Sequence, residues 1–159
     1  MRLGGQAGDG IASTGESVAR CFSRMGLHLF GLNAYQSVIR GGHVWYQARA
    51  SEGRPYSSGD RADILYAFDR ASVDIHAAQV RPGGTVIYDP EKFTVGATDL
   101  PAGVLRLEVP TLAIARKYTN QSILQNAGGV GAVAYLAGIP LDLLQIGRAS
   151  CRERVWIPV

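Results

Sequence analysis

Lysine and cysteine are scarce in this chain of 159 residues, and each scarcity excludes a class of function. The only lysines are Lys92 and Lys117, and the arginines are scattered, whereas nucleic-acid-binding proteins gather basic residues into a patch. The two cysteines, Cys21 and Cys151, cannot by themselves build a disulfide framework or hold an iron–sulfur cluster. No apolar run is long enough for a membrane span and no signal peptide is visible, so we expect a cytoplasmic protein without nucleic-acid or membrane partners.

The remaining composition is that of a folded domain. Hydrophobic residues make up 47% and charged residues 18% of the chain, and no segment is polar enough to indicate disorder. The length suits one domain with a real core rather than two.

The C-terminal segment differs in character from the rest. Residues 146–159 show no hydrophobic period, although they follow Pro140–Leu144, which has the pattern of a helix that should continue. Back-translated, the segment from Gln145 onward can be written as a widely used sequencing adapter read in frame; the alternative is an ordinary polar tail. We expect residues 1–145 to form the domain, truncated at its C-terminus, and residues 146–159 to be non-native read-through. Without the three arginines and one glutamate of this tail, the formal net charge falls from +3 to +1.

Strand and helix patterns alternate along the chain. Apolar runs and alternation predict strands over residues 2–4, 27–32, 43–50, 62–68, 85–89 and 104–109, and 3.6-residue periodicity predicts helices over 11–25, 72–80, 110–118 and 122–136. This order predicts an α/β fold: a doubly wound, Rossmann-like three-layer sandwich with a mainly parallel sheet.

A glycine-rich segment, Gly4-Gly5-Gln6-Ala7-Gly8-Asp9-Gly10, joins the first strand to the first helix. Such turns can bind phosphate, because the helix N-terminus presents free N–H groups and glycine lets an anion approach them. The spacing Gly5-x-x-Gly8-x-Gly10 is not the dinucleotide-binding G-x-G-x-x-G, and Ile11-Ala12 replaces the Lys-Ser/Thr of a P-loop. Phosphate or partner binding and a tight turn that packs helix on sheet therefore remain alternatives.

Other polar residues give weaker signals. Arg40-Gly41-Gly42-His43 can present a guanidinium and free N–H groups to an anion, or can simply bend the chain before a strand. Asp63, Asp69 and Asp89 lie in or after strands, where carboxylates either line ligand sites or cap helices. His28, His43 and His76 show no metal-ligand spacing, and His28 in an apolar strand is expected in the core, as is Cys21.

Several of these segments together resemble the gamma-type domain of 2-oxoacid:ferredoxin oxidoreductases. The resemblance covers residues 1–145 and rests on motifs in a fixed order: the glycine segment with Thr14-Gly15-Glu16, Gly26-Leu27-His28-Leu29-Phe30, Tyr35-Gln36-Ser37-Val38-Ile39-Arg40-Gly41-Gly42-His43, Ser57-x-Gly59-Asp60-x-x-Asp63, and Arg81-Pro82-Gly83-Gly84-x-x-Ile87-Tyr88-Asp89. The family usually has Pro where this chain has Gln36. The opening is more similar to the fused alpha subunit of the 2-oxoglutarate-type enzymes than to a separate gamma subunit.

The resemblance implies an accessory subunit or domain of a multi-subunit oxidoreductase. Such enzymes convert pyruvate, 2-oxoglutarate or a related 2-oxoacid with coenzyme A into an acyl-CoA and carbon dioxide, and reduce ferredoxin. It implies that thiamine diphosphate and iron–sulfur clusters are held by partner subunits or domains, so that this chain binds no cofactor alone and has no catalytic or metal-binding residue. The domain would assist assembly and coenzyme A or substrate access. The residues expected to take part are Gly5, Gln6, Gly8, Gly10, Ser37, Arg40, Gly41 and Gly42.

Two other functions remain possible from the sequence. One is a stand-alone NAD(P)-dependent dehydrogenase. Two features disfavour it: the glycines do not have the G-x-G-x-x-G spacing, and Leu32-Asn33 offers no acidic residue to bind a ribose hydroxyl. The other is a purely structural assembly module.

Overall fold

The computed structural model describes residues 1–35, 42–118 and 125–144, which contain one six-stranded sheet. The strands, in chain order, are β1 (Arg2–Gln6), β2 (His28–Tyr35), β3 (His43–Ser51), β4 (Ala62–Ala67), β5 (Val80–Tyr88) and β6 (Leu105–Glu108). Across the sheet their order is β2-β3-β1-β4-β5-β6. The pairs β1–β4, β4–β5 and β5–β6 are parallel, and β3 is antiparallel to both β1 and β2. All strands except β3 therefore point the same way, which confirms the predicted mainly parallel sheet.

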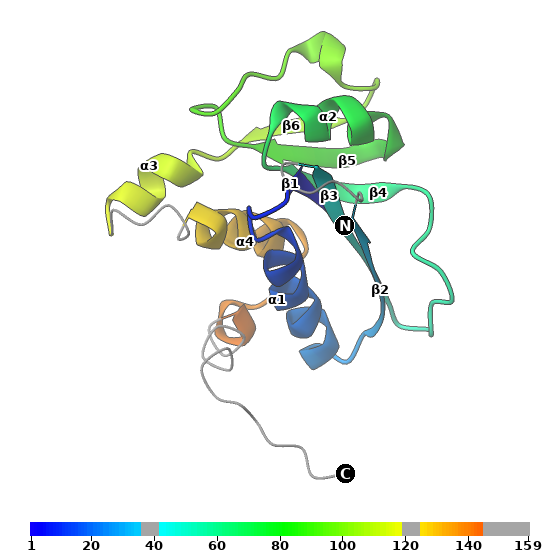
Figure 1. The fold of residues 1–159 in the computed structure, drawn as a ribbon. Helices are drawn as coiled ribbons and strands as arrows, with labels where there is room; N and C mark the ends of the chain where they lie inside the picture. Colours follow the sequence, from blue (N-terminus) through cyan, green and yellow to red (C-terminus); the bar gives the residue numbers. More distant parts are fainter. Residues whose placement is uncertain (36–41, 119–124, 145–159) are drawn as a thin grey trace.

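Helices cover both faces of this sheet (Figure 1). The α-helices are α1 (Ile11–Arg24), α2 (Arg70–His76), α3 (Thr111–Arg116) and α4 (Gln125–Leu136), with short 3₁₀ turns η1 (Ala77–Gln79) and η2 (Ala97–Asp99). Helix α2 lies on one face, whereas α1 and α4 lie on the other. The three-layer arrangement expected from the alternation of elements is therefore confirmed. None of the described helices is long and apolar enough to cross a membrane.

The larger core cluster lies between the sheet and helices α1 and α4. Two tyrosines of this cluster explain why each helix carries a glycine where it faces the sheet. A Cβ added to Gly15 of α1 would lie 2.1 Å from the Tyr46 ring, and one added to Gly129 of α4 would lie 2.1 Å from the Tyr66 ring. Both tyrosines are buried on strands β3 and β4. The two helices can thus approach the sheet closely only because they carry glycine at these positions.

The second cluster lies under α2 on the opposite face and is built from Leu65, Val73, Val86 and Tyr88, with neighbouring small residues. Together the clusters bury both faces of β4 and β5, which explains why these strands read as continuous apolar runs in the sequence.

Four details differ from the sequence-based expectations. The first two glycines of the glycine segment, Gly4 and Gly5, belong to strand β1 rather than to the turn. Strand β2 continues to Tyr35, beyond the predicted end at residue 32, because it forms a long antiparallel ladder with β3. The predicted helix over residues 72–80 is split between α2 and η1. His28 was expected in the core, and this was wrong, because it lies exposed at the start of the edge strand β2.

Candidate functional site

Three segments that are distant in the sequence meet where β1 ends. The Ala7 N–H, just after β1, donates a hydrogen bond to the Gly42 carbonyl oxygen at 3.1 Å. The Asn126 side-chain Nδ2, at the start of α4, donates to the Asp9 carbonyl oxygen at 2.8 Å. The loop between β1 and α1 is therefore held from two sides, next to the start of β3 and the start of α4. Carboxyl ends of parallel strands are where open α/β sheets place their ligands.

The first two glycines of the glycine segment have a packing role. A Cβ added to Gly5 would lie 2.7 Å from Ile11 Cδ1 and 2.9 Å from Phe68 Cβ. A Cβ added to Gly4 would lie 2.9 Å from Ser72 Oγ. Real Cβ atoms do not come this close to other heavy atoms, so glycine is needed here for the packing of helices on β1.

Of the last two glycines of the segment, Gly8 is open, whereas a Cβ added to Gly10 would lie 2.9 Å from Asn126 Nδ2. Gly8 and Gly10 have φ values of 105° and 78°, and a Cβ added to Gly8 would meet no atom within 4 Å. Gly10 is the residue before α1 and provides no side-chain cap. The nearby polar side chains have other hydrogen-bond partners. The Asp9 carboxylate accepts from the Gln6 N–H at 3.0 Å, and the Ser13 hydroxyl donates to the Gly10 carbonyl at 2.9 Å. Among the described residues, no side chain caps the start of α1, so its first N–H groups suit an anion.

The predicted site residues fall into three groups. Gln6, Gly8, Gly10 and Gly42 come together at this loop, and Gln6 pairs with His43 in the β1–β3 ladder. Gly5 lies next to them but faces Ile11 and Phe68, as described above. Ser37, Arg40 and Gly41 lie outside the described residues, so their contribution stays a prediction, as does the extent of the domain beyond Leu144.

The aspartates at the strand ends turn out to support helices. Asp69 caps α2, since its Oδ1 accepts from the Ser72 N–H at 2.8 Å. Asp89 is buried at the end of β5, and its Oδ2 accepts from the Thr111 hydroxyl at 2.6 Å and from the Leu112 N–H at 2.9 Å. Burial by itself would raise the pKa of Asp89, but these hydrogen bonds outweigh it and hold the pKa below its ordinary value. Asp63 is exposed and forms an ion pair with Arg81.

Two histidines that sequence spacing does not connect lie in contact. His43 Nε2 and His76 Nε2 are 2.8 Å apart, and the buried Arg2 guanidinium lies 3.2 Å from His76 Nδ1. The sequence signal that could have pointed to this cluster is the two-residue repeat of strand β1, which places Arg2 and Gly4 on the same face of the sheet. Within the described part of the chain, no group of three histidine, cysteine or acidic side chains is placed to hold a metal ion.

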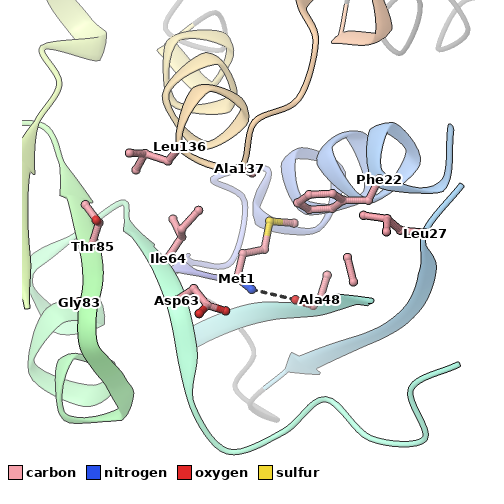
Figure 2. Close-up of a pocket in the computed structure, with 11 residues that line it drawn as sticks. Met1, Phe22, Leu27, Ala48, Asp63, Ile64, Gly83, Thr85, Leu136 and Ala137 are labelled. Atoms are coloured by element: carbon pink, nitrogen blue, oxygen red, sulfur yellow. Dashed lines mark hydrogen bonds between the residues drawn. The ribbon is translucent and has the colours of Figure 1, made fainter. Parts of the chain in front are cut away.

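A cavity of about 460 Å³ lies at the opposite end of the sheet, near the start of β1 (Figure 2). Its wall is mostly apolar and includes Phe22, Ile64 and Leu136. The Met1 amino group donates to the Ala48 carbonyl oxygen at 2.8 Å, and burial lowers the pKa of this amine. None of the predicted site residues lines this cavity, so the glycine loop remains the candidate site.

Comparison with known proteins gives a consistent result. The profile of the pyruvate ferredoxin/flavodoxin oxidoreductase family matches residues 1–155. The alpha subunit of 2-oxoacid:ferredoxin oxidoreductase 2 from Aeropyrum pernix is 33% identical over 99% of this chain and 24% of its own length. The ketoisovalerate oxidoreductase subunit VorA of Methanothermobacter marburgensis is 30% identical over 74% of this chain and 24% of its own length. The chain thus spans about a quarter of the length of these relatives.

Two of the solved structures that share this fold are from 2-oxoacid:ferredoxin oxidoreductases. The 2-oxoglutarate:ferredoxin oxidoreductase of Magnetococcus marinus, solved with 2-oxoglutarate, coenzyme A and succinyl-CoA bound, matches with a TM-score of 0.80 and 28% identity, over 92% of this chain and 25% of its own. The gamma subunit of keto/oxoacid ferredoxin oxidoreductase from Geobacter sulfurreducens matches with a TM-score of 0.76 and 21% identity, over 96% of this chain and 85% of its own. At that lower identity, the second match shows the fold alone.

Proposed function

The chain belongs to the pyruvate ferredoxin/flavodoxin oxidoreductase family, and from this premise we propose that it is an accessory domain of a 2-oxoacid:ferredoxin oxidoreductase. The complex oxidises a 2-oxoacid with coenzyme A to an acyl-CoA and carbon dioxide, and passes the electrons to ferredoxin. Other domains or subunits hold thiamine diphosphate and the iron–sulfur clusters. This domain contributes to assembly and to access of coenzyme A or the 2-oxoacid to the reaction centre.

The uncapped start of α1, which follows the loop whose Ala7 N–H binds the Gly42 carbonyl, is the observation that carries this proposal. Coenzyme A bears phosphate groups, and backbone N–H groups at a helix N-terminus attract such anions. Arg40 precedes Gly42 in the sequence by two residues, so its guanidinium can add a charge-assisted hydrogen bond to the same phosphate. A related enzyme that was solved with coenzyme A bound supports the choice of this ligand.

Kinetics of the assembled enzyme test the ligand part of the proposal. We expect Arg40→Ala to raise the KM for coenzyme A about tenfold, the usual size of a lost hydrogen bond to a charged group, with a much smaller effect on kcat. Arg20→Ala is a suitable control, because Arg20 lies on α1, is half-exposed and is 4.0 Å from Glu16 rather than near Gly42. An unchanged KM for coenzyme A in Arg40→Ala would remove the ligand-binding role.

Purification tests the assembly part. The full-length protein should copurify with a thiamine-binding partner, whereas a stable monomer without partners would contradict the proposal. Intact assembly combined with unchanged kinetics in the loop variants would instead indicate a purely structural module.

A further inference from the structure

A chain of hydrogen bonds joins β1, α2 and β3 through Arg2, His76 and His43. Arg2 Nη1 lies 3.2 Å from His76 Nδ1, and His76 Nε2 lies 2.8 Å from His43 Nε2. Arg2 and His76 are only 5% and 4% exposed. The guanidinium also donates to the side-chain oxygens of Gln47 and Gln79, and within the described part of the chain it has no carboxylate partner. A buried positive charge and two imidazole rings therefore meet here with neutral hydrogen-bond partners.

Only one arrangement of protons completes this chain of hydrogen bonds. Arginine has donors only, so His76 Nδ1 must accept and carries no proton. The His76 proton is then on Nε2 and is donated to His43 Nε2, which must accept. The His43 proton is in turn on Nδ1. Both rings are thus neutral when the chain of hydrogen bonds is intact.

A further proton on either ring places two donors face to face. On His76 it would occupy Nδ1 and meet the Arg2 N–H, and on His43 it would occupy Nε2 and meet the His76 N–H. Moving the His76 proton from Nε2 to Nδ1 would relieve the second conflict but create the first. Facing donors lose a hydrogen bond in a buried site, and the added charge lies beside that of Arg2. Protonation of the pair therefore requires that the chain of hydrogen bonds opens.

The pKa of His76 agrees in direction with this geometry. Burial, followed by the charges of Arg2 and His43, lowers the pKa of His76 from 6.5 to about 4. The hydrogen bond with Gln79 and the Asp69 carboxylate at the start of α2 raise this pKa, but their effects are smaller. Because the pKa of His76 is lower in the folded chain than in the opened one, the stabilisation is fully present above pH 6.5 and is lost as the pH falls towards 4.

We propose that this chain of hydrogen bonds is an acid-sensitive latch that holds α2 on the sheet. Three of the seven residues of α2 are buried, and His76 is one of them, together with Ser72 and Val73. A short helix with few buried residues can open locally while the sheet stays folded. Protonation of His76 therefore releases α2 rather than the whole domain. This inference goes beyond the proposed function and does not depend on which ligand the domain binds.

Hydrogen exchange of the assembled enzyme at several pH values tests the latch. The Ala77 amide, at the end of α2, donates to the Val73 carbonyl oxygen and reports opening of the helix. We expect its protection factor, which corrects for the pH dependence of intrinsic exchange, to fall about thirtyfold between about pH 7.5 and about pH 5. The Thr14 amide of α1, on the opposite face of the sheet, donates to the Gly10 carbonyl oxygen at 2.9 Å and should keep its protection. An unchanged protection factor at Ala77, or an equal fall at Thr14 and Ala77, would overturn the proposal.

A variant without the two titrating rings separates the latch from other effects of acid. In the double variant with His43→Gln and His76→Gln, each amide side chain can accept one hydrogen bond and donate another without taking up a proton. We expect its Ala77 protection factor to change less than about threefold over the same pH range. His28→Gln is the matched control, because His28 is exposed at the start of β2, and it should behave as the wild type does. A fall in the double variant as large as that in the wild type would contradict the latch.

The His76 ring gives a second readout if the double variant does not assemble. In the wild-type enzyme with isotope-labelled histidine, the nuclear magnetic resonance signal of the His76 ring should show no titration near pH 6.5 while the Ala77 amide remains protected. A His76 ring that titrates near pH 6.5 while α2 stays closed would overturn the proposal. These outcomes are independent of the KM for coenzyme A in Arg40→Ala, which tests the proposed function.

Discussion

Helices α1, α2 and α3 all begin where a strand of the sheet ends, but their first turns are completed differently. Helix α2 is capped by the Asp69 carboxylate, and the first turn of α3 is held by the buried Asp89 carboxylate. Helix α1 begins after Gly10 with no side-chain cap, although Asp9 and Ser13 are adjacent. Two of these helix starts thus receive a carboxylate of the chain, whereas within residues 1–35, 42–118 and 125–144 no side chain caps the third.

This difference distinguishes the capped helix starts, which support the fold, from the uncapped start at which we propose that an anion binds. A side-chain cap would stabilise a helix by about 1 kcal/mol, and Gly10 provides none at the start of α1. An aspartate at a strand end is therefore a poor guide to ligand binding in this fold. An uncapped helix start that follows a glycine loop is a better guide. Substitutions at the two kinds of site should give different phenotypes.

The largest effect on stability is expected at Asp89. Asp89→Ala leaves the Thr111 hydroxyl and the Leu112 N–H without their acceptor in a buried site, so we expect a loss of about 3 kcal/mol in the free energy of unfolding. Urea unfolding measures it, with Asp63→Ala as the exposed control. A loss no larger than that of the control would mean that Asp89 does not support α3.

The same carboxylate predicts a pH dependence. The pKa of Asp89 is lower in the folded chain than its ordinary value of 3.8, so its stabilisation is fully present above that value and is lost as the pH falls through the folded pKa. The stability difference between wild type and Asp89→Asn should therefore shrink below about pH 4. A difference that stays constant from pH 6 to pH 3 would contradict this assignment.

The packed part of the glycine segment gives the next largest effect. In Gly5→Ala the new Cβ would clash with Ile11 and Phe68, and we expect a loss of about 2 kcal/mol, measured by chemical unfolding. Gly53→Ala is the matched control, because a Cβ there meets no atom within 4 Å. Equal stability of the two variants would show that the start of the segment is not needed for packing.

Removal of the α2 cap should have a smaller effect. Asp69→Ala leaves the Ser72 N–H without its acceptor, for an expected loss of about 1 kcal/mol, and should leave the KM for coenzyme A unchanged. A changed KM without a change in stability would mean that Asp69 belongs to the binding site, and the contrast with α1 would fail.

Much of the fold could be predicted from the sequence because it is encoded in local periodicity. The strand predicted over residues 43–50 from alternation is present as β3, with Val44, Tyr46 and Ala48 buried, and Cys21 is buried as expected. The position of β3 between β1 and β2 could not be predicted, since strand order depends on long-range pairing that no local pattern records.

The candidate site was predictable only in part. The glycine segment indicated a special loop, but spacing alone could not separate Gly5, which packs, from Gly8, which is open. The meeting of Arg2, His43 and His76 was missed because the three residues come from different elements and share no sequence spacing. Only the tertiary structure brings them together.

Two glycines at opposite ends of α1 offer the most direct test of the central claim. Gly8 and Gly26 both have positive φ, at 105° and 82°, and a Cβ at either position would meet no atom within 4 Å. Positive φ strains any side chain and asparagine tolerates it best, so each Asn variant should cost about 1–2 kcal/mol of stability. In the assembled enzyme, we predict that Gly8→Asn raises the KM for coenzyme A about tenfold by obstructing the helix N-terminus, while Gly26→Asn leaves it unchanged. Equal KM values for the two variants would contradict the claim that the start of α1 is the binding surface of this domain.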